Sequence, residues 1–424
     1  MTVAASFLGG AKSRLLPASV PLRFFASAAI FHVLMWVALF AGAEQATSYR
    51  GGAGPGLAAI HLLTLGVLTT TAIGASVQLL PVATRRALAA VWPIKLVFWL
   101  VVPGVVGLAP AMYVVFVPAL IASALLVTVG LLLFAGLLVD NLRRAGSLPV
   151  VAAYGWTALA SLLALTGMGL GLAFDYENAI LPDHGSFALA HLILAGFGFM
   201  GFLALGFSYV LVPMFALASM PAKQVSFIGF ALAVAGLISG VLGALLDSRA
   251  VLTSACLFGL GAATLYLWGM GGALRTGMRK RLGLSFVLIR IAWAMLPLSI
   301  VAGLASLHGY AGQNGPTLFG FLLVGGWLLT FLFGVLQRIL PFLASMHVTQ
   351  PRGSPPLVSE LAAAWPLKVH AACHLAALAT IAAAILSDQV MLTRLGAAVG
   401  LLGALAFAWF TADVLRRVIN SAHA

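Results

Sequence analysis

Twelve long apolar stretches dominate this sequence and restrict what the chain can fold into. A helix that crosses a bilayer needs about 20 consecutive apolar residues, whereas a transmembrane β-barrel shows short segments of alternating polarity. The apolar runs here are continuous, and we therefore predict an all-α integral membrane protein with twelve transmembrane helices. The expected spans are residues 22–44, 54–81, 90–109, 111–139, 148–174, 184–217, 222–246, 250–274, 283–307, 315–343, 366–387 and 393–415.

The composition supports the same class. Hydrophobic residues make up 62% of the 424 residues and charged residues only 7%. A soluble globular protein is about 25% charged, and a disordered chain is poor in apolar residues, so both classes are excluded. The chain is predicted to be one membrane domain, residues 1–424, whose partner is the lipid bilayer. Its net charge of +13 is explained by basic loops and does not indicate a nucleic-acid partner.

The basic residues are distributed unevenly between the two sides of the predicted bundle. The loops on one side hold only Arg50, Arg249 and Arg394, together with most of the acidic residues. Because Lys and Arg are retained on the cytoplasmic side of a membrane, both termini are predicted to be cytoplasmic. The first apolar run has no small-residue cleavage site and is expected to be a retained span. The cytoplasmic set comprises Arg85, Arg86, Arg143, Arg144, Lys223, Arg275, Arg279, Lys280, Arg281, Arg352, Arg416 and Arg417.

A motif recurs three times at intervals of about 130 residues. In the second, sixth and tenth spans a glycine precedes a proline by seven residues, and another glycine lies eight residues before the first. Small residues on one face allow helices to approach closely. We therefore predict three like-oriented four-helix repeats, at about residues 15–145, 146–281 and 282–424. The motif residues are Gly66, Gly74 and Pro81; Gly198, Gly206 and Pro213; and Gly326, Gly334 and Pro341.

Short strings in these spans carry a resemblance to a known family. The second span begins His61-Leu-Leu-Thr-Leu-Gly66 and ends Gln78-Leu-Leu-Pro81, and the sixth contains Ala190-His191-Leu-Ile-Leu and Val210-Leu-Val-Pro213. The first span opens with Pro21-Leu-Arg-Phe-Phe25. With twelve helices in three arcs, the chain resembles subunit I of the haem-copper oxidases and the related NnrS-like membrane proteins, which implies an oxidase subunit I-like bundle.

The resemblance also implies a function. It suggests a bacterial inner-membrane protein that binds haem b, with copper as a second candidate cofactor, and that serves electron transfer or the handling of nitric oxide or oxygen. An oxidoreductase activity and a redox partner such as cytochrome c or quinol would follow. His61 matches the family's haem ligand on the second span. The tenth and seventh spans carry no histidine, so the binuclear oxygen-reducing centre of the oxidases is not implied.

Five histidines are the candidate ligands. His61 and His191 lie at similar depth in the second and sixth spans, ~10 Å from the outer interface at 1.5 Å per residue. Neutral imidazole is a common ligand of haem iron and copper, so these two side chains could share a site. His370 and His374 are spaced four residues apart, which places both on one face near the cytoplasmic end of the eleventh span. They could clamp a metal ion or supply a haem ligand.

Depth separates these candidates into groups. The two pairs are on the order of 15 Å apart along the membrane normal in a hydrocarbon core of ~30 Å. They are therefore expected to be two sites, or one site and one structural pair. His32 lies midway along the first span and could belong to either. The alternative for every one of them is a hydrogen bond that joins neighbouring helices.

Several other functions are disfavoured. No acidic residue lies deep in a span, which argues against a proton pump or an ion-coupled transporter. The two cysteines, Cys256 and Cys373, are far apart in the sequence, so neither a disulfide framework nor a thiolate zinc site is expected. Two alternatives remain beside the redox function: a haem or copper carrier or assembly factor without redox turnover, and a membrane scaffold without a cofactor.

Overall fold

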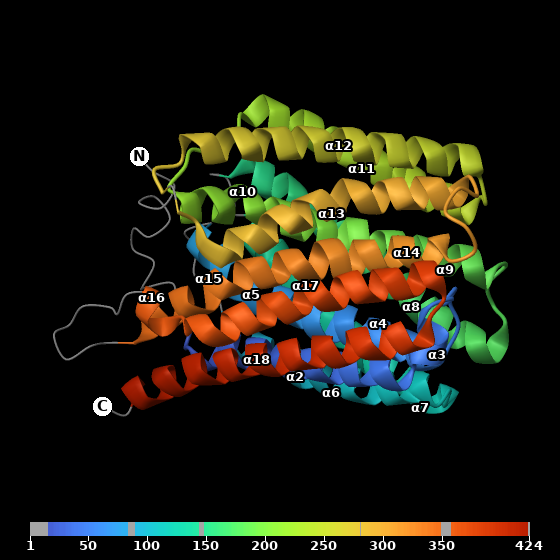
Figure 1. Ribbon diagram of the computed structural model, residues 1–424, viewed down its shortest axis with the longest axis horizontal. Helices are drawn as coiled ribbons and strands as arrows, with labels where there is room; N and C mark the ends of the chain where they lie inside the picture. The colour runs from blue at the N-terminus through green and yellow to red at the C-terminus, as the bar shows by residue number, and fades with distance from the viewer. Residues whose placement is uncertain (1–15, 84–89, 144–147, 280, 349–357, 423–424) are drawn as a thin grey trace.

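The computed structural model describes residues 16–83, 90–143, 148–279, 281–348 and 358–422 (Figure 1). Throughout these ranges the regular secondary structure is helical. Twelve of the helical segments are long and apolar enough to cross a membrane, as the sequence predicts. The chain is therefore a multi-pass membrane protein whose apolar outer surface contacts lipid.

Nine spans are single α-helices and three are composite. The single helices are α2 (Ser19–Ala41), α6 (Trp92–Tyr113), α7 (Val117–Leu142), α8 (Pro149–Asn178), α11 (Lys223–Leu245), α12 (Arg249–Thr276), α13 (Gly283–Leu307), α17 (Ala364–Ser387) and α18 (Val390–Ala422). The composite spans are α4 (Pro55–His61), η2 (Leu62–Thr69) and α5 (Thr70–Ala83); α9 (His184–Ile193), η3 (Leu194–Gly201) and α10 (Phe202–Ala216); and α14 (Gly315–Phe321), η4 (Leu322–Leu329) and α15 (Thr330–His347). The connections contain the short helices α3 (Ala43–Ala46) and α16 (Val358–Leu361).

The boundaries agree with the predicted spans to within about four residues, except that the fourth span begins at Val117 instead of residue 111, because α6 continues to Tyr113, and that the last helix ends later than expected. The apolar run was expected to end at residue 415, but α18 continues to Ala422. Asp413 accepts hydrogen bonds from Arg416 and Arg417, both at 2.9 Å. Pairs at this spacing stabilise a helix, so the helix continues past the point where the hydropathy falls.

Each composite span contains a π-helix of eight residues, η2, η3 or η4. All three π-helices begin at the same distance in sequence before the motif prolines Pro81, Pro213 and Pro341. A π-helix bonds each N–H to the carbonyl five residues back and often occurs at functional sites. The hydroxyls of Thr70 and Thr330 donate to carbonyls at that spacing, at 2.9 and 3.1 Å.

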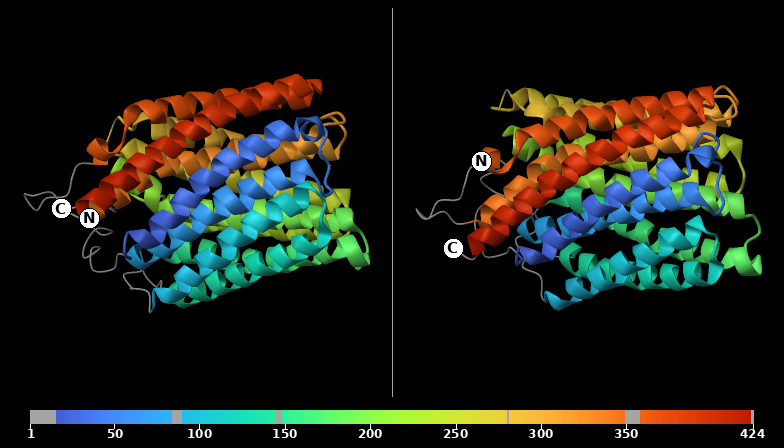
Figure 2. Two further views of the ribbon diagram at one scale, coloured as in Figure 1. Left: turned by 90° about the horizontal axis from the view of Figure 1, so that it is seen from below. Right: turned by 60° about the horizontal axis from the view of Figure 1, so that its bottom comes forward.

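The helices form a closed bundle (Figures 1 and 2). Three pairs of consecutive helices form antiparallel hairpins, and the two helices of each hairpin pack closely on each other. The pairs are α6–α7, α11–α12 and α17–α18. Figure 1 shows α11–α12 along one edge and α6–α7 along the opposite edge. Helix α7 packs on α8, α12 on α13, and α18 on α2, so the last span of the chain meets the first.

The composite spans form the centre of this bundle. The buried share of the spanning window is 67% for the spans that contain η2 and η4 and 56% for the one that contains η3, against 11% for α12. The η4 segment packs against both η2 and η3. Side chains on these three spans are therefore mostly held among helices, whereas most of α12 faces outward.

The motif glycines allow each composite span to approach its neighbour closely. A Cβ atom at the second glycine of each motif would lie 2.8–2.9 Å from a side chain of α2, α8 or α13, a separation that real Cβ atoms do not tolerate. The close approach that small residues were predicted to provide is therefore present at all three. The pairs are Gly74 with Phe24, Gly206 with Tyr154, and Gly334 with Ile289.

The first helix, α2, begins and the last helix, α18, ends at the same side of the bundle (Figure 2). We call this side, which holds Ser19 and Ala422, the terminal end, and the opposite side the far end. The far end holds Arg50, Arg249 and Arg394. Among the basic residues expected on the other side, those at the terminal end are Arg143, Lys223, Arg275, Arg279, Arg281, Arg416 and Arg417, whereas Arg85, Arg86, Arg144, Lys280 and Arg352 lie outside the described residues.

Candidate functional site

His61 and His191 form a first group of candidate ligands, called here the far-end pair. His61 is the last residue of α4 and directly precedes η2, and His191 lies three residues before η3. Nδ1 of His61 is 3.0 Å from the carbonyl oxygen of Leu57. Nδ1 of His191 is 3.0 Å from that of Leu165 on α8. Both rings thus bond a backbone carbonyl through Nδ1, His61 within its own helix and His191 across to α8.

This pattern fixes the tautomer of both rings. A carbonyl oxygen only accepts hydrogen bonds, so Nδ1 of His61 and of His191 carries the proton and Nε2 keeps its lone pair. Both side chains are half-buried. The far-end pair therefore offers two neutral imidazoles, each oriented through Nδ1 and each with Nε2 available as a ligand.

The space for the His191 ring depends on a glycine of α8. A Cβ atom at Gly169 would lie only 2.9 Å from Cε1 of His191. Any larger residue at this position would push the imidazole away from the carbonyl of Leu165. Gly169 therefore belongs to the site, although no sequence motif indicated it.

His32, His370 and His374 form a second group, called here the inner cluster. The rings of His32 and His370 have centroids 5.9 Å apart, and those of His370 and His374 are stacked at 5.7 Å. Phe333 of α15 lies against all three rings, at 4.5, 4.4 and 5.5 Å. The exposed fraction of each of the three histidines is 1% or less. His32, which the sequence left unassigned, thus belongs with the pair on α17.

Two hydrogen bonds orient the inner cluster. The indole N–H of Trp36, one turn along α2, donates to Nε2 of His32 at 2.9 Å. Oγ1 of Thr330 is 2.9 Å from Nε2 of His374 and also donates to the carbonyl oxygen of Gly325 at 3.1 Å. Because a hydroxyl has one proton, Thr330 accepts the bond from His374.

Four ring nitrogens of the inner cluster are buried without a hydrogen-bond partner. They are Nδ1 of His32, both nitrogens of His370, and Nδ1 of His374. An unsatisfied buried polar atom costs about 1–3 kcal/mol, so four in one place are a costly arrangement. Across the described residues, however, no three His, Cys, Asp or Glu side chains are arranged to hold a metal ion together.

The two groups differ in their fit to a haem. At the inner cluster Phe333 packs against every imidazole and Phe407 lies 4.9 Å from the ring of His370, so aromatic side chains fill the space that a porphyrin would need. At the far-end pair the imidazoles keep accessible surface and free Nε2 atoms. The far-end pair thus offers donor atoms of the kind that bind a b-type haem, whereas aromatic side chains occupy the space around the inner cluster.

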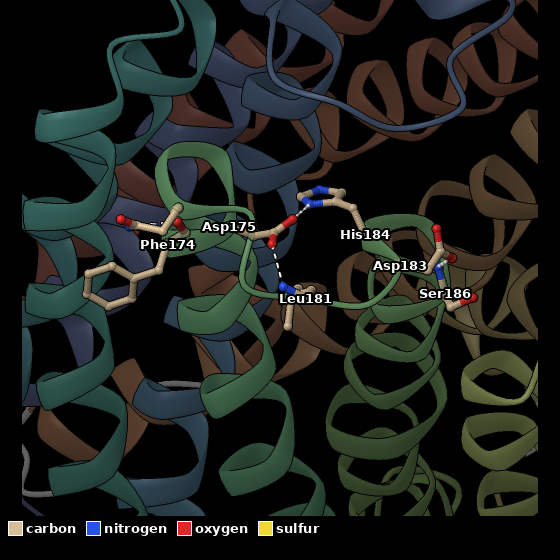
Figure 3. Close-up of polar contacts among 7 residues, drawn as sticks. Phe174, Asp175, Leu181, Asp183, His184 and Ser186 are labelled. Carbon is tan, nitrogen blue, oxygen red and sulfur yellow. Dashed lines mark hydrogen bonds and ion pairs between the residues drawn. The ribbon is translucent and has the colours of Figure 1, made fainter.

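A hydrogen-bonded turn at the far end positions the start of α9 (Figure 3). Asp175, in the last turn of α8, accepts from Nδ1 of His184 at 2.7 Å and from the backbone N–H of Leu181 at 2.7 Å. Asp183 caps α9 by accepting from the backbone N–H of Ser186 at 2.7 Å. The hydroxyl and the backbone N–H of Ser186 lower the pKa of Asp183. This turn sets the position of α9 and therefore of His191.

A buried row of aromatic side chains was not singled out by the sequence. Tyr154, Tyr209, Tyr266 and Trp293 have successive ring centroids 5.5, 5.8 and 6.1 Å apart. The indole of Trp293 donates to the hydroxyl of Tyr266 at 3.1 Å, which donates to Oγ of Ser208 at 2.8 Å. The row joins α8, α10, α12 and α13 and stabilises their packing through tilted and edge-to-face ring contacts and through the hydrogen bonds of Tyr266.

No protein-family model matches the sequence, and a search of curated proteins found no match.

Proposed function

We propose that this protein holds a b-type haem between His61 and His191 and uses it for electron transfer or for the handling of a diatomic gas such as nitric oxide or oxygen. One observation carries the proposal. Each of the two imidazoles is oriented by an Nδ1–H bond to a backbone carbonyl, which leaves Nε2 free at a half-buried position. This is the arrangement in which histidine binds haem iron.

The same proposal places the protein in a bacterial inner membrane with its terminal end in the cytoplasm. The far end carries three of the 22 Lys and Arg residues, as expected for a surface that has been translocated. The far-end pair would then lie toward the outer face. A redox partner such as cytochrome c on the outside, or quinol within the bilayer, could approach it there.

We further propose that the bundle consists of three like-oriented four-helix repeats. Three features support this arrangement at the expected spacing: the π-helices η2, η3 and η4, the close approaches at the motif glycines, and the hairpins that follow each composite span. His61 and His191 then occupy comparable places in the first two repeats. A site between two repeats uses one ligand from each.

The residues around the rings have distinct roles. A haem held by His61 and His191 would supply a reversible one-electron change, and a small gas could bind it only if one of the two imidazoles were released. The carbonyls of Leu57 and Leu165 hold the rings in one orientation and one tautomer. Hydrogen bonds of this kind make an imidazole a stronger ligand. Gly169 leaves room for the His191 ring.

A haem carrier or assembly factor without redox turnover is the second candidate. The half-buried state of His61 and His191 favours it, because ligands with accessible surface can release a cofactor. The two functions differ in exchange rate. A carrier would pass its haem to an acceptor such as apomyoglobin within minutes, whereas an electron-transfer protein would keep it through many cycles of oxidation and reduction.

A visible spectrum tests the haem site. Protein from haem-supplied cells is purified in detergent, and the dithionite-reduced minus air-oxidised spectrum is measured with the iron content of the same sample. We expect a sharp α band and about one iron per chain, and loss of the band in His61→Ala and in His191→Ala. His308→Ala is the matched control, because His308 lies at the exposed far end and bonds only Thr253 in the described structure. A flat spectrum from the unmodified protein would overturn the proposal.

A further inference from the structure

We propose that the terminal end of the bundle binds one anionic phospholipid, whose phosphate lies between Arg275 and the first turn of α11. The starting observation is a cavity of about 480 Å³ between the end of α12 and the connection from α10 to α11. Ligand sites typically have volumes of about 300–1,000 Å³. The cavity shares no residue with the far-end pair or the inner cluster, so the inference is independent of the haem proposal.

One wall of the cavity is polar. It is formed by Arg275 and Thr276, in the last turn of α12, and by Ser219, in the connection after α10. The hydroxyl of Thr276 donates to the carbonyl oxygen of Ala273 at 2.8 Å, and Oγ of Ser219 is 3.0 Å from Oγ1 of Thr276. None of the residues that line the cavity is acidic. The guanidinium charge of Arg275 is therefore not offset inside the cavity, and its N–H groups suit phosphate oxygens.

The first turn of α11 contributes a second positive feature. Ala222 and Val225 line the cavity, and α11 begins at Lys223. The first N–H groups of a helix have no partner within the helix, and no side chain caps those of α11. These N–H groups and the positive end of the helix dipole favour an anion, and the first turn holds no acidic residue. Two helices thus present positive charge to the same cavity.

The rest of the cavity is apolar and open. Leu267 and Trp268 of α12 line it, and Trp268 is 68% exposed. No atom lies within 4 Å of the Cβ positions at Gly271 and Gly272, which leaves space along the surface of α12. Tryptophan is enriched where a membrane protein crosses from the acyl chains to the head groups. The occupant must therefore have an anionic group at one end and an apolar part beside it, as a phospholipid does.

The charges at this end favour an anionic lipid over a zwitterionic one. Lys223 begins α11, and Arg279 and Arg281 follow α12. Basic pockets between transmembrane helices bind anionic head groups, and each basic residue near the surface strengthens the binding about fivefold. A zwitterionic lipid would bring its own cation close to these residues. A free phosphate ion would occupy the polar wall alone and leave the apolar part of the cavity uncovered.

Native mass spectrometry of the full chain tests the site. Detergent-purified protein is titrated with dioleoylphosphatidylglycerol, which is anionic, or with dioleoylphosphatidylcholine, which has the same acyl chains and no net charge. We expect one phosphatidylglycerol molecule to bind with a dissociation constant about fivefold below that of phosphatidylcholine. Equal binding of the two lipids, or no binding of either, would overturn the proposal.

A charge substitution locates the head group. Arg275→Gln removes the cation from the polar wall, and we expect the affinity for phosphatidylglycerol to fall about fivefold while that for phosphatidylcholine stays unchanged. Arg143→Gln is the matched control, because Arg143 is an exposed residue at the terminal end of α7, on the opposite edge of the bundle (Figure 1). Equal losses in the two variants would reflect the overall surface charge and would contradict a site at Arg275.

A substitution that fills the cavity locates the acyl chains. Gly272→Leu places an apolar side chain in the open space and keeps Arg275, and we expect it to abolish tight binding of phosphatidylglycerol. Gly136→Leu is the control, since Gly136 is an exposed residue of α7 that also has no atom within 4 Å of its Cβ position. Retention of the tightly bound lipid in Gly272→Leu would overturn the proposed position.

Thermal unfolding in detergent provides a second readout. A ligand that binds only the folded state raises the unfolding temperature, so phosphatidylglycerol should raise that of the unmodified protein and not that of Gly272→Leu. Without added lipid, both cavity variants should unfold no earlier than the unmodified protein, which shows that they are folded. Excess inorganic phosphate should not displace the lipid. Displacement would identify a site for free phosphate and would contradict the lipid.

Discussion

The indole N–H of Trp36 donates to Nε2 of His32 at 2.9 Å, within one turn of the same helix. Both residues are almost completely buried, with exposed fractions of 2% and 1%. The bond fixes the orientation and the tautomer of an imidazole that would otherwise be free to turn in an apolar surrounding. A single pair on α2 thus determines what His32 can offer to the two histidines of α17.

Replacing Trp36 by Phe removes the donor and leaves Nε2 of His32 buried without a partner. We expect the free energy of unfolding to fall by about 1–3 kcal/mol, the cost of an unsatisfied buried polar atom. Thermal unfolding in detergent measures it. Trp99→Phe is the control, because Trp99 is 64% exposed and faces lipid. Equal effects of the two changes would contradict the role of this bond.

Gly334→Ala should destabilise the bundle. The new Cβ would lie 2.8 Å from Cγ1 of Ile289 and 3.0 Å from the backbone oxygen of Ser285, so α13 and α15 would have to separate. Overpacking of this kind costs about 1–3 kcal/mol. Gly271→Ala is the matched control, because no atom lies within 4 Å of its Cβ position. A loss of thermal stability in the control as large as in Gly334→Ala would argue against close helix contact as the cause.

Asp413→Asn should cost more than a change at an exposed ion pair. The Asp413 side chain is 6% exposed and contacts both Arg416 and Arg417 at 2.9 Å. Loss of the Asp413 charge weakens the hydrogen bonds that this carboxylate accepts from the two arginines. We expect the free energy of unfolding to fall by about 1–3 kcal/mol. Glu44→Gln, which removes an exposed pair with Arg394, should cost about 1 kcal/mol or less. Thermal unfolding of both variants at one salt concentration provides the comparison.

Asp183 should give the folded protein an acid-sensitive contribution. The Ser186 hydroxyl and backbone N–H lower the pKa of Asp183 in the folded state. A carboxyl with a lowered pKa stabilises the fold at pH values above its ordinary pKa of about 4 and loses this effect as the pH falls through the lowered value. Asp183→Asn keeps a capping oxygen but does not titrate, so its unfolding temperature should depend less on pH below about 5. If the unfolding temperatures of the variant and of the unmodified protein fell in parallel below about pH 5, this contribution of Asp183 would be ruled out.

The fold was predictable from the sequence to a large extent because hydropathy reports directly on the bilayer. Each of the twelve apolar runs corresponds to a spanning segment. The π-helices were not predicted, because eight apolar residues such as Leu62–Thr69 have no composition that separates a π-helix from an α-helix. The extension of α18 past residue 415 was also not predicted, because the end of this helix is charged and hydropathy detects only apolar segments.

The sequence indicated the candidate histidines but not how the fold groups them. Depth along the helices separated the far-end pair from His370 and His374. It could not assign His32, because helix rotation decides which neighbour a mid-span residue faces. Trp36 could have been found from its spacing of four residues after His32, which places both on one face. Phe333 and Thr330 come from a distant span, and only the fold brings them to the cluster.

Each π-helix also fixes an angular relation within its span. In an α-helix one residue corresponds to a turn of about 100°, so removing one residue from η2 to restore an α-helix would rotate everything after it by that angle relative to everything before it. His61 lies before η2, and Gly74 lies after it. With the deletion, His61 could keep its direction only if Gly74 turned away from Phe24. The length of the π-helix therefore sets the phase between the ligand-bearing half of the span and the half that packs on α2.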